Sequence, residues 1–178
     1  MAAIDFIEVG KPMPDWVLDF ETFGPDRQMF TMQDVKEYDL PPYTFVPYFR
    51  GNINCCEVTD SSRDVISSRF SGCLMGIWKG WDGSVFVGHI TTDPDETYDC
   101  KELWAEKMSE CKCGWAFKPS DFILPLPPGV LTWKCFGLFT FNADLTAYAA
   151  FSIITENHAQ GVPNTVLKKV LVRKGTLI

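Results

Sequence analysis

Two side chains in the middle of the chain have the chemistry of a nucleophile and its base. Cys73 follows the small residues Ser71-Gly72, and His89 interrupts the apolar run Val85–Ile90, where a strand favours valine or threonine. A cysteine attacks as the thiolate, and a neighbouring imidazole takes the thiol proton and later returns it to a leaving amine. If Gly72 to Leu74 forms a sharp turn, its backbone N–H groups would make an oxyanion hole. The pair therefore indicates thiol-dependent amide chemistry, and an inert, buried Cys73 is the alternative.

The other histidine and the other cysteines favour no second site. His158 lies in a polar stretch and is expected to be a surface histidine. The seven cysteines are Cys55, Cys56, Cys73, Cys100, Cys111, Cys113 and Cys135. Their number is odd and no signal-peptide pattern precedes them, so we expect reduced thiols. The adjacent pair and the one-residue gap do not fit the ligand spacing of a structural zinc site, and no metal is expected.

A hairpin is expected to bring Cys73 and His89 onto neighbouring strands. Two apolar runs, Cys73–Trp78 and Val85–Ile90, flank an Asp-Gly pair, which is a strong turn signal. With Asp82-Gly83 at its centre, the simplest register places Gly76 opposite His89. Cys73 then lies three positions farther along its strand. That register needs a longer loop or a bulge to bring the thiol to the imidazole.

The rest of the chain predicts a mostly β structure. Strands are expected at Arg27–Met32, Tyr43–Phe49, Leu131–Phe141, Ala147–Thr155 and Val166–Val172, and a helix at Glu96–Cys111. Pro47 places the second of these strands at the edge of a sheet. The fold class is therefore α+β, with a mostly antiparallel, β-sandwich-like sheet core and one or two covering helices.

Length and charge limit the classes of function. The 178 residues, 46% hydrophobic, fit a single domain over 1–178, with an acidic, Pro-rich, irregular front at 1–60 and a β-rich core at 65–178 that carries the site. The net charge is −7, and the front alone holds four basic and eleven acidic residues. Such a balance repels phosphate backbones, so nucleic-acid binding is not expected. No apolar run would span a membrane, and no signal-peptide pattern is seen. We expect a cytoplasmic protein, or one exported as an effector without a recognisable signal peptide.

Phe70-Ser71-Gly72-Cys73, followed sixteen residues later by His89, resembles the motif of a group of protein-glutamine deamidases. The group contains the catalytic domain of the cytotoxic necrotizing factors, the Burkholderia lethal factor and the chemotaxis-receptor deamidase. The resemblance covers Ser67 to Thr92 and implies a β-sandwich packed by helices. It also implies a third residue upstream of the cysteine, often threonine, that orients the imidazole. Ser67 matches that position best, and Ser68 is the next choice.

The resemblance implies a cysteine-dependent glutamine deamidase with Cys73 as nucleophile and His89 as base. Its substrate would be a protein presenting a glutamine, no cofactor would be needed, and kinship with some members implies a toxin or effector role. Two alternatives remain open. One is a Cys-His hydrolase of other amides or peptides. The other is a non-catalytic binding module that uses exposed aromatic residues, above all Trp81 in the hairpin turn.

Overall fold

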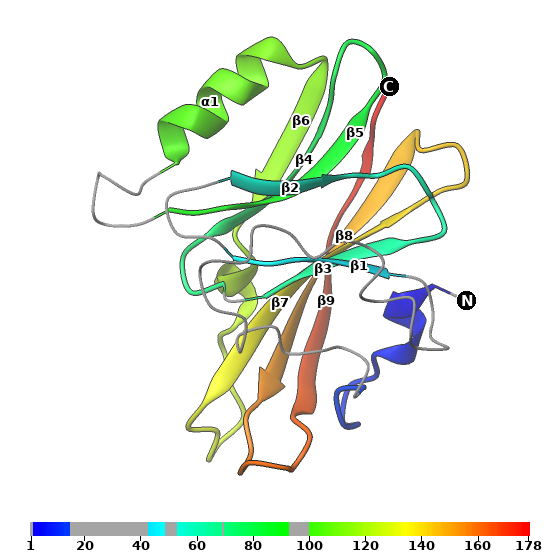
Figure 1. Ribbon diagram of the computed structural model, residues 1–178. Helices are drawn as coiled ribbons and strands as arrows, with labels where there is room; N and C mark the ends of the chain where they lie inside the picture. The colour runs from blue at the N-terminus through cyan, green and yellow to red at the C-terminus, as the bar shows by residue number, and fades with distance from the viewer. Residues whose placement is uncertain (1, 15–42, 49–52, 69, 93–99) are drawn as a thin grey trace.

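The computed structural model describes residues 2–14, 43–48, 53–68, 70–92 and 100–178, whose strands form two sheets (Figure 1). The five-stranded sheet has the order β1 (Tyr43–Val46), β3 (Asp64–Ser67), β7 (Trp133–Phe141), β8 (Ala147–Glu156) and β9 (Thr165–Thr176). The four-stranded sheet has the order β2 (Ile53–Glu57), β5 (Val85–Ile90), β4 (Leu74–Lys79) and β6 (Cys113–Phe117). Every pairing is antiparallel except that of β1 with β3.

Helical structure is sparse in the described residues. It comprises α1 (Lys101–Glu110) and two short 3₁₀ helices, η1 (Ala3–Phe6) and η4 (Pro119–Phe122). Trp104 joins α1 to the four-stranded sheet: its ring meets that of Trp78 edge-on at 5.5 Å, and a Cβ on Gly76 would lie 2.8 Å from it. The α+β class with a mostly antiparallel core is thereby confirmed. None of the described helices has the length and apolar character needed to cross a membrane.

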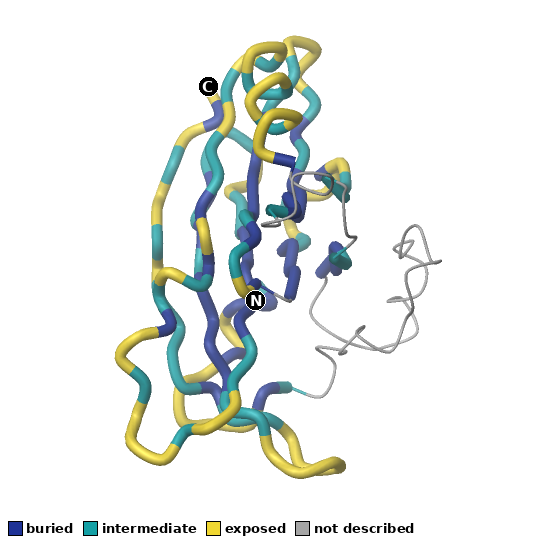
Figure 2. The backbone as a smooth tube through the Cα atoms, turned by 90° about the vertical axis from the view of Figure 1, so that its left-hand side faces the viewer, coloured by how far each residue is buried: buried dark blue, intermediate teal, exposed yellow. Residues whose placement is uncertain are grey.

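The largest hydrophobic cluster draws side chains from both sheets. Val65 and Phe139 come from the five-stranded sheet, and Met75 and Val87 come from the four-stranded sheet. A second cluster packs the N-terminal segment against the five-stranded sheet; it includes Ile4, Ile7, Ile66, Phe136, Leu138 and Ile153. Figure 2 shows buried residues concentrated along the strands, whereas α1 and the end loops are largely exposed. The contact region between the sheets is therefore where a strand residue such as His89 loses contact with water.

Most strand predictions agree with the structure, including the edge position of β1, which ends at Val46 before Pro47. The predicted strand at Arg27–Met32 and the first residues of the predicted helix lie outside the described residues. Sequence reasoning missed β2, β3 and β6, of which β3 (Asp64–Ser67) is only four residues long. β2 is rich in cysteine and polar residues, and β6 contains Gly114 shortly after the end of α1, so neither has the usual composition of a strand.

The predicted register of the β4–β5 hairpin is wrong by one residue. Met75, and not Gly76, pairs with His89, and Lys79 pairs with Val85. The cause is a five-residue loop, Gly80–Ser84, closed by a hydrogen bond from the Gly80 N–H to the Ser84 carbonyl at 2.8 Å. Because side chains alternate between faces along a strand, a one-residue shift moves each of them to the other face of the sheet.

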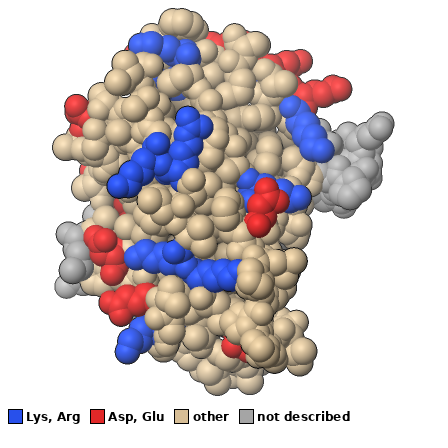
Figure 3. Space-filling view, turned by 180° about the vertical axis from the view of Figure 1, so that it is seen from behind, with Lys and Arg blue, Asp and Glu red and all other residues tan. Residues whose placement is uncertain are grey.

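One edge of the five-stranded sheet is formed by β9, whose first residues pair with the N-terminal segment at Pro12 and which carries four basic residues. Lys168 Nζ donates to the Ile123 carbonyl at 2.8 Å, and Lys169 Nζ donates to the Ile4 carbonyl at 2.9 Å. Arg173 stacks over Trp115 at 4.9 Å. Figure 3 shows that Lys and Arg side chains on the rear face form several separate groups, some of them beside Asp and Glu. Three of the four basic side chains of β9 therefore contact neighbouring segments of the same chain.

Candidate active site

The His89 side chain is buried at the contact between the two sheets. It lies near the end of β5 and is 1% exposed. The Phe70 ring stacks on the imidazole with centroids 4.3 Å apart and planes 10° apart, and Tyr48 meets it edge-on at 5.4 Å. These two aromatic contacts fix the plane of the imidazole and exclude water from it.

Ser67 reaches His89 from the opposite sheet. Its Oγ lies 2.7 Å from His89 Nδ1 and 2.5 Å from the carbonyl oxygen of Val46. A hydroxyl has one proton to donate, and a carbonyl oxygen only accepts, so the Ser67 proton goes to Val46. Nδ1 of His89 must then donate to Ser67 Oγ. The hydrogen bonds thereby select the neutral tautomer that carries its proton on Nδ1.

The other ring nitrogen, Nε2, is left as an unprotonated acceptor. It is buried, and it has no hydrogen-bond partner among the described residues. Burial lowers the pKa of His89 from 6.5 to about 3, because a charged imidazolium loses its hydration there. At neutral pH the ring is therefore neutral, with a lone pair held ready on Nε2. Buried polar atoms are rarely left unpaired, and those that are often have a functional reason.

Cys73 is buried in the same hydrophobic cluster as Met75, the residue that pairs with His89. It directly precedes β4, two residues before Met75. If the chain continues as extended backbone, the side chains of Cys73 and Met75 point to the same face, and Cys73 becomes a diagonal neighbour of His89. Diagonal neighbours lie about 7–8 Å apart, within reach of an aromatic side chain. The observed register thus places Cys73 two positions from the residue that pairs with His89, where the predicted register placed it three positions away.

The approach to Cys73 is narrow but bordered by small residues. Cys73 itself is 6% exposed, whereas Ser71 is exposed and Gly72 is partly exposed. No heavy atom lies within 4 Å of the position where a Cβ on Gly72 would be. Ser68, the second choice for the orienting residue, is buried, but the hydrogen bond to the imidazole is made by Ser67. The structure therefore brings Ser67 and His89 into direct contact, whereas His89 Nε2 makes no hydrogen bond to the Cys73 thiol, which precedes the paired residues by two positions.

A glycine on the opposite sheet makes room for this arrangement. Gly137 pairs with Ser67 across β3 and β7. A Cβ on Gly137 would collide with the sulfur of Met75 and lie 3.3 Å from the Phe70 ring. The absence of a side chain at residue 137 therefore leaves room for Met75 and for the Phe70 ring that stacks on the imidazole.

Four other cysteines have a raised pKa and are therefore protonated at neutral pH. Burial raises the pKa of Cys56 and of Cys135 to about 12, and it also raises the pKa of Cys55 and Cys111. The structure has no disulfide among the seven cysteines, all of which lie in described residues. His158 is exposed, as expected, and bonds Thr165 through Nε2 at 2.8 Å.

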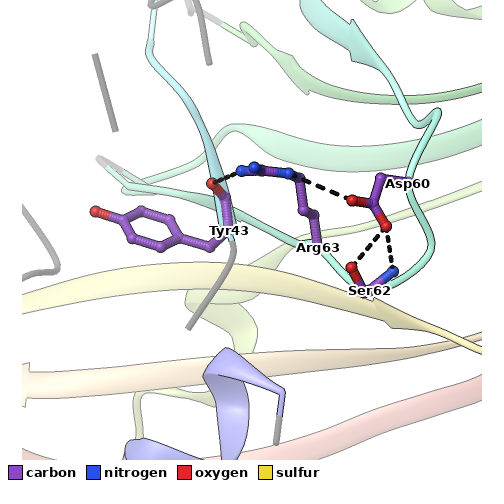
Figure 4. Close-up of polar contacts among 4 residues, drawn as sticks. All are labelled: Tyr43, Asp60, Ser62 and Arg63. Atoms are coloured by element: carbon purple, nitrogen blue, oxygen red, sulfur yellow. Dashed lines mark hydrogen bonds and ion pairs between the residues drawn. The ribbon is translucent and has the colours of Figure 1, made fainter. Parts of the chain in front are cut away.

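A small surface hollow is lined by residues of β2 and β3 and of the loop that joins them. Figure 4 shows the polar contacts of Arg63 and Asp60, which line it. Its cation, Arg63, contacts Asp60 at 3.6 Å and the Tyr43 carbonyl at 3.5 Å. Asp60 also accepts two hydrogen bonds from Ser62, which lower the pKa of its carboxyl. Arg63 and Asp60, two of the charged groups that line this hollow, are thus already paired with each other. Its thiol, Cys56, is protonated at neutral pH.

Sequence reasoning missed several residues that shape the site. Val46 acts through a backbone carbonyl, which leaves no signature in the sequence. Phe70 lies within the motif, but only the fold shows its stacking on His89. In the described part of the chain, no three metal-ligating side chains gather into a metal site.

The chain was compared with protein families, curated proteins and solved structures. No protein-family model matches the chain, and neither a curated protein nor a solved structure matches it significantly.

Proposed function

We propose that the protein is a cysteine-dependent protein-glutamine deamidase with Cys73 as nucleophile, His89 as base and Ser67 as the residue that orients His89. The observation that carries the proposal is the chain of hydrogen bonds from His89 Nδ1 to Ser67 and from Ser67 to Val46, which leaves Nε2 as a buried acceptor. The fold that goes with this proposal is a β-sandwich, in which the site lies between the sheets.

The first half of the reaction forms a thioester. His89 Nε2 takes the proton of Cys73 while the sulfur attacks the side-chain carbonyl of a substrate glutamine. The negative charge then lies on the carbonyl oxygen of the tetrahedral intermediate. Backbone N–H groups of Gly72 to Leu74 are the proposed donors to that oxygen. His89 gives its proton to the amide nitrogen, the C–N bond breaks, and ammonia leaves.

The second half hydrolyses the thioester. His89 Nε2 takes a proton from water, the resulting hydroxide attacks the acyl carbon, and Cys73 leaves as a thiolate that recovers the proton. Glutamine and water become glutamate and ammonium, so the substrate protein gains one negative charge. No metal or organic cofactor takes part in these steps.

The low pKa of His89 determines how the proton moves. A neutral, buried imidazole does not hold a permanent thiolate–imidazolium pair. Proton transfer must therefore accompany the attack, when the new negative charge stabilises the imidazolium in a medium of low dielectric constant. Nδ1–H remains bonded to Ser67 throughout, which keeps Nε2 aimed in one direction.

The test is glutamine conversion in heavy-oxygen water. The protein is incubated with a mixture of intact cellular proteins, and mass spectrometry maps glutamines that become glutamates carrying one heavy oxygen. We expect such sites with the wild-type protein and none with Cys73→Ala. Cys135→Ala is the matched control, since Cys135 is an equally buried cysteine in the same core. Labelled new chain ends in place of labelled glutamates would indicate a peptidase. Absence of both would overturn the proposal.

A second candidate function rests on Trp81. This side chain is 75% exposed in the Gly80–Ser84 loop, a rare position for so large an apolar group. Exposed tryptophans are frequent anchors of protein interfaces. A binding module predicts that Trp81→Ala abolishes the capture of a partner, whereas Cys73→Ala leaves that capture intact.

A further inference from the structure

Thr92, two residues after the end of β5, is hydrogen-bonded to Gly72, the residue before Cys73. Its Oγ1 donates a hydrogen bond to the Gly72 carbonyl at 2.5 Å. The register of β4 with β5 ends at the pair Leu74 and Ile90. The hydroxyl therefore acts two residues beyond that last pair, where the chain on one side leads into Cys73.

Gly72 is a residue that needs such a restraint. Glycine has more backbone freedom than any other residue, and this one has no neighbour within 4 Å on its Cβ side. Because the peptide unit is planar, holding the Gly72 carbonyl oxygen also fixes the nitrogen of Cys73 and the direction in which its Cα leaves. The Thr92 hydroxyl thus limits the rotation of the peptide that carries the nucleophile.

The hydrogen bond from Thr92 to Gly72 also restrains the backbone of Cys73 relative to His89. Thr92 follows His89 by three residues and lies two residues beyond the end of β5, so the Gly72 carbonyl is held by the segment that continues from the strand of His89. The bond length is at the short end of the range for O–H···O hydrogen bonds.

We propose that Thr92 is a positioning residue of the Cys73–His89 pair, acting through the Gly72 carbonyl. This inference rests on the proposed function, because it assigns Thr92 a role only if His89 acts on the thiol. It adds a hydroxyl on the β5 side to the one that Ser67 supplies from the opposite sheet.

The test is a double-mutant cycle on the alkylation rate of Cys73 with iodoacetamide. Rates are measured by peptide mapping in the wild-type, His89→Gln, Thr92→Val and doubly substituted proteins. A positioning role predicts that the ratio of rates with and without His89 shrinks by at least about threefold when Thr92 is valine. Thr92→Ser, which keeps the hydroxyl, should restore the wild-type ratio.

The outcomes separate the two proposals. If His89→Gln leaves the Cys73 rate unchanged in the wild-type background, the proposed function fails. If His89→Gln slows Cys73 but the ratio is the same with threonine and valine, Thr92 is merely structural and this inference is wrong. Thr92→Ala removes the same donor with a smaller side chain, and it provides the ratio if the valine variant does not fold.

Discussion

Ser67 and His89 belong to different sheets, yet their side chains meet with 2.7 Å between Oγ and Nδ1. The Ser67 hydroxyl is itself bonded to the Val46 carbonyl on β1. Three strands from two sheets therefore determine the state of one imidazole. A histidine used only to fill the core would be satisfied by partners at both ring nitrogens, whereas here Nε2 has none among the described residues.

The protonation state of His89 is the first prediction. We expect a neutral ring with its proton on Nδ1 from pH 5 to pH 8, because burial lowers its pKa to about 3. Nitrogen chemical shifts of the two ring atoms in labelled protein distinguish the tautomers. Ser67→Ala should change the tautomer equilibrium, because the acceptor for Nδ1–H is then lost. A proton on Nε2 in the wild-type protein would contradict the hydrogen-bond assignment.

The pH dependence of stability is the second prediction, and two buried groups oppose each other in it. The pKa of His89 is lower in the folded protein than in the unfolded chain, so stability is lost as pH falls from 6.5 towards 3. Burial raises the pKa of Asp64 from 3.8 to about 7, even though its carboxylate accepts a hydrogen bond from the Ile4 N–H. Its contribution is therefore lost as pH rises from 3.8 towards 7.

Substitution separates the two effects. The free energy of unfolding of Asp64→Asn, taken relative to wild type, should rise with pH between 4 and 7 by up to about 1.4 kcal/mol per pH unit. That of His89→Gln, taken in the same way, should rise as pH falls from 6.5 towards 3. Urea unfolding at several pH values measures both. Differences that do not vary with pH would show that neither group has the shifted pKa.

Gly137 provides the third prediction. Gly137→Ala should lower the free energy of unfolding by about 1–3 kcal/mol, because the new Cβ collides with Met75 and crowds Phe70. The matched control is Gly72→Ala, where nothing lies within 4 Å, and its effect should stay below about 1 kcal/mol. Equal stability of the two variants would mean that Gly137 does not make room for the side chains packed on His89.

The strands with strong composition signals were predictable, and the exact pairing between them was not. Local turn chemistry identified the hairpin at Asp82-Gly83, but the loop closes between Gly80 and Ser84, and this shifts the register by one residue. That shift decides whether Met75 or Gly76 lies opposite His89. Hydrogen bonding across the whole loop sets it, so no single dipeptide reveals it.

For the site, the motif pointed to Ser67 and His89, and the structure places them in contact. Contacts made through the backbone or through stacking had no signal in one sequence. The Val46 carbonyl, the Phe70 ring and the Gly72 carbonyl that Thr92 holds become visible only when distant segments are brought together. The catalytic role of Cys73 is still a prediction.

The most direct test of the central claim is the alkylation rate of each cysteine at pH 7 in the wild-type, His89→Gln and Ser67→Ala proteins. If Nε2 of His89 takes the thiol proton, Cys73 should slow at least about tenfold in His89→Gln. It should slow less in Ser67→Ala, and the other six cysteines should keep their rates. Circular dichroism confirms that the variants are folded. A Cys73 rate that is the same in all three folded proteins would show that Cys73 and His89 are neighbours in a core and not a catalytic pair.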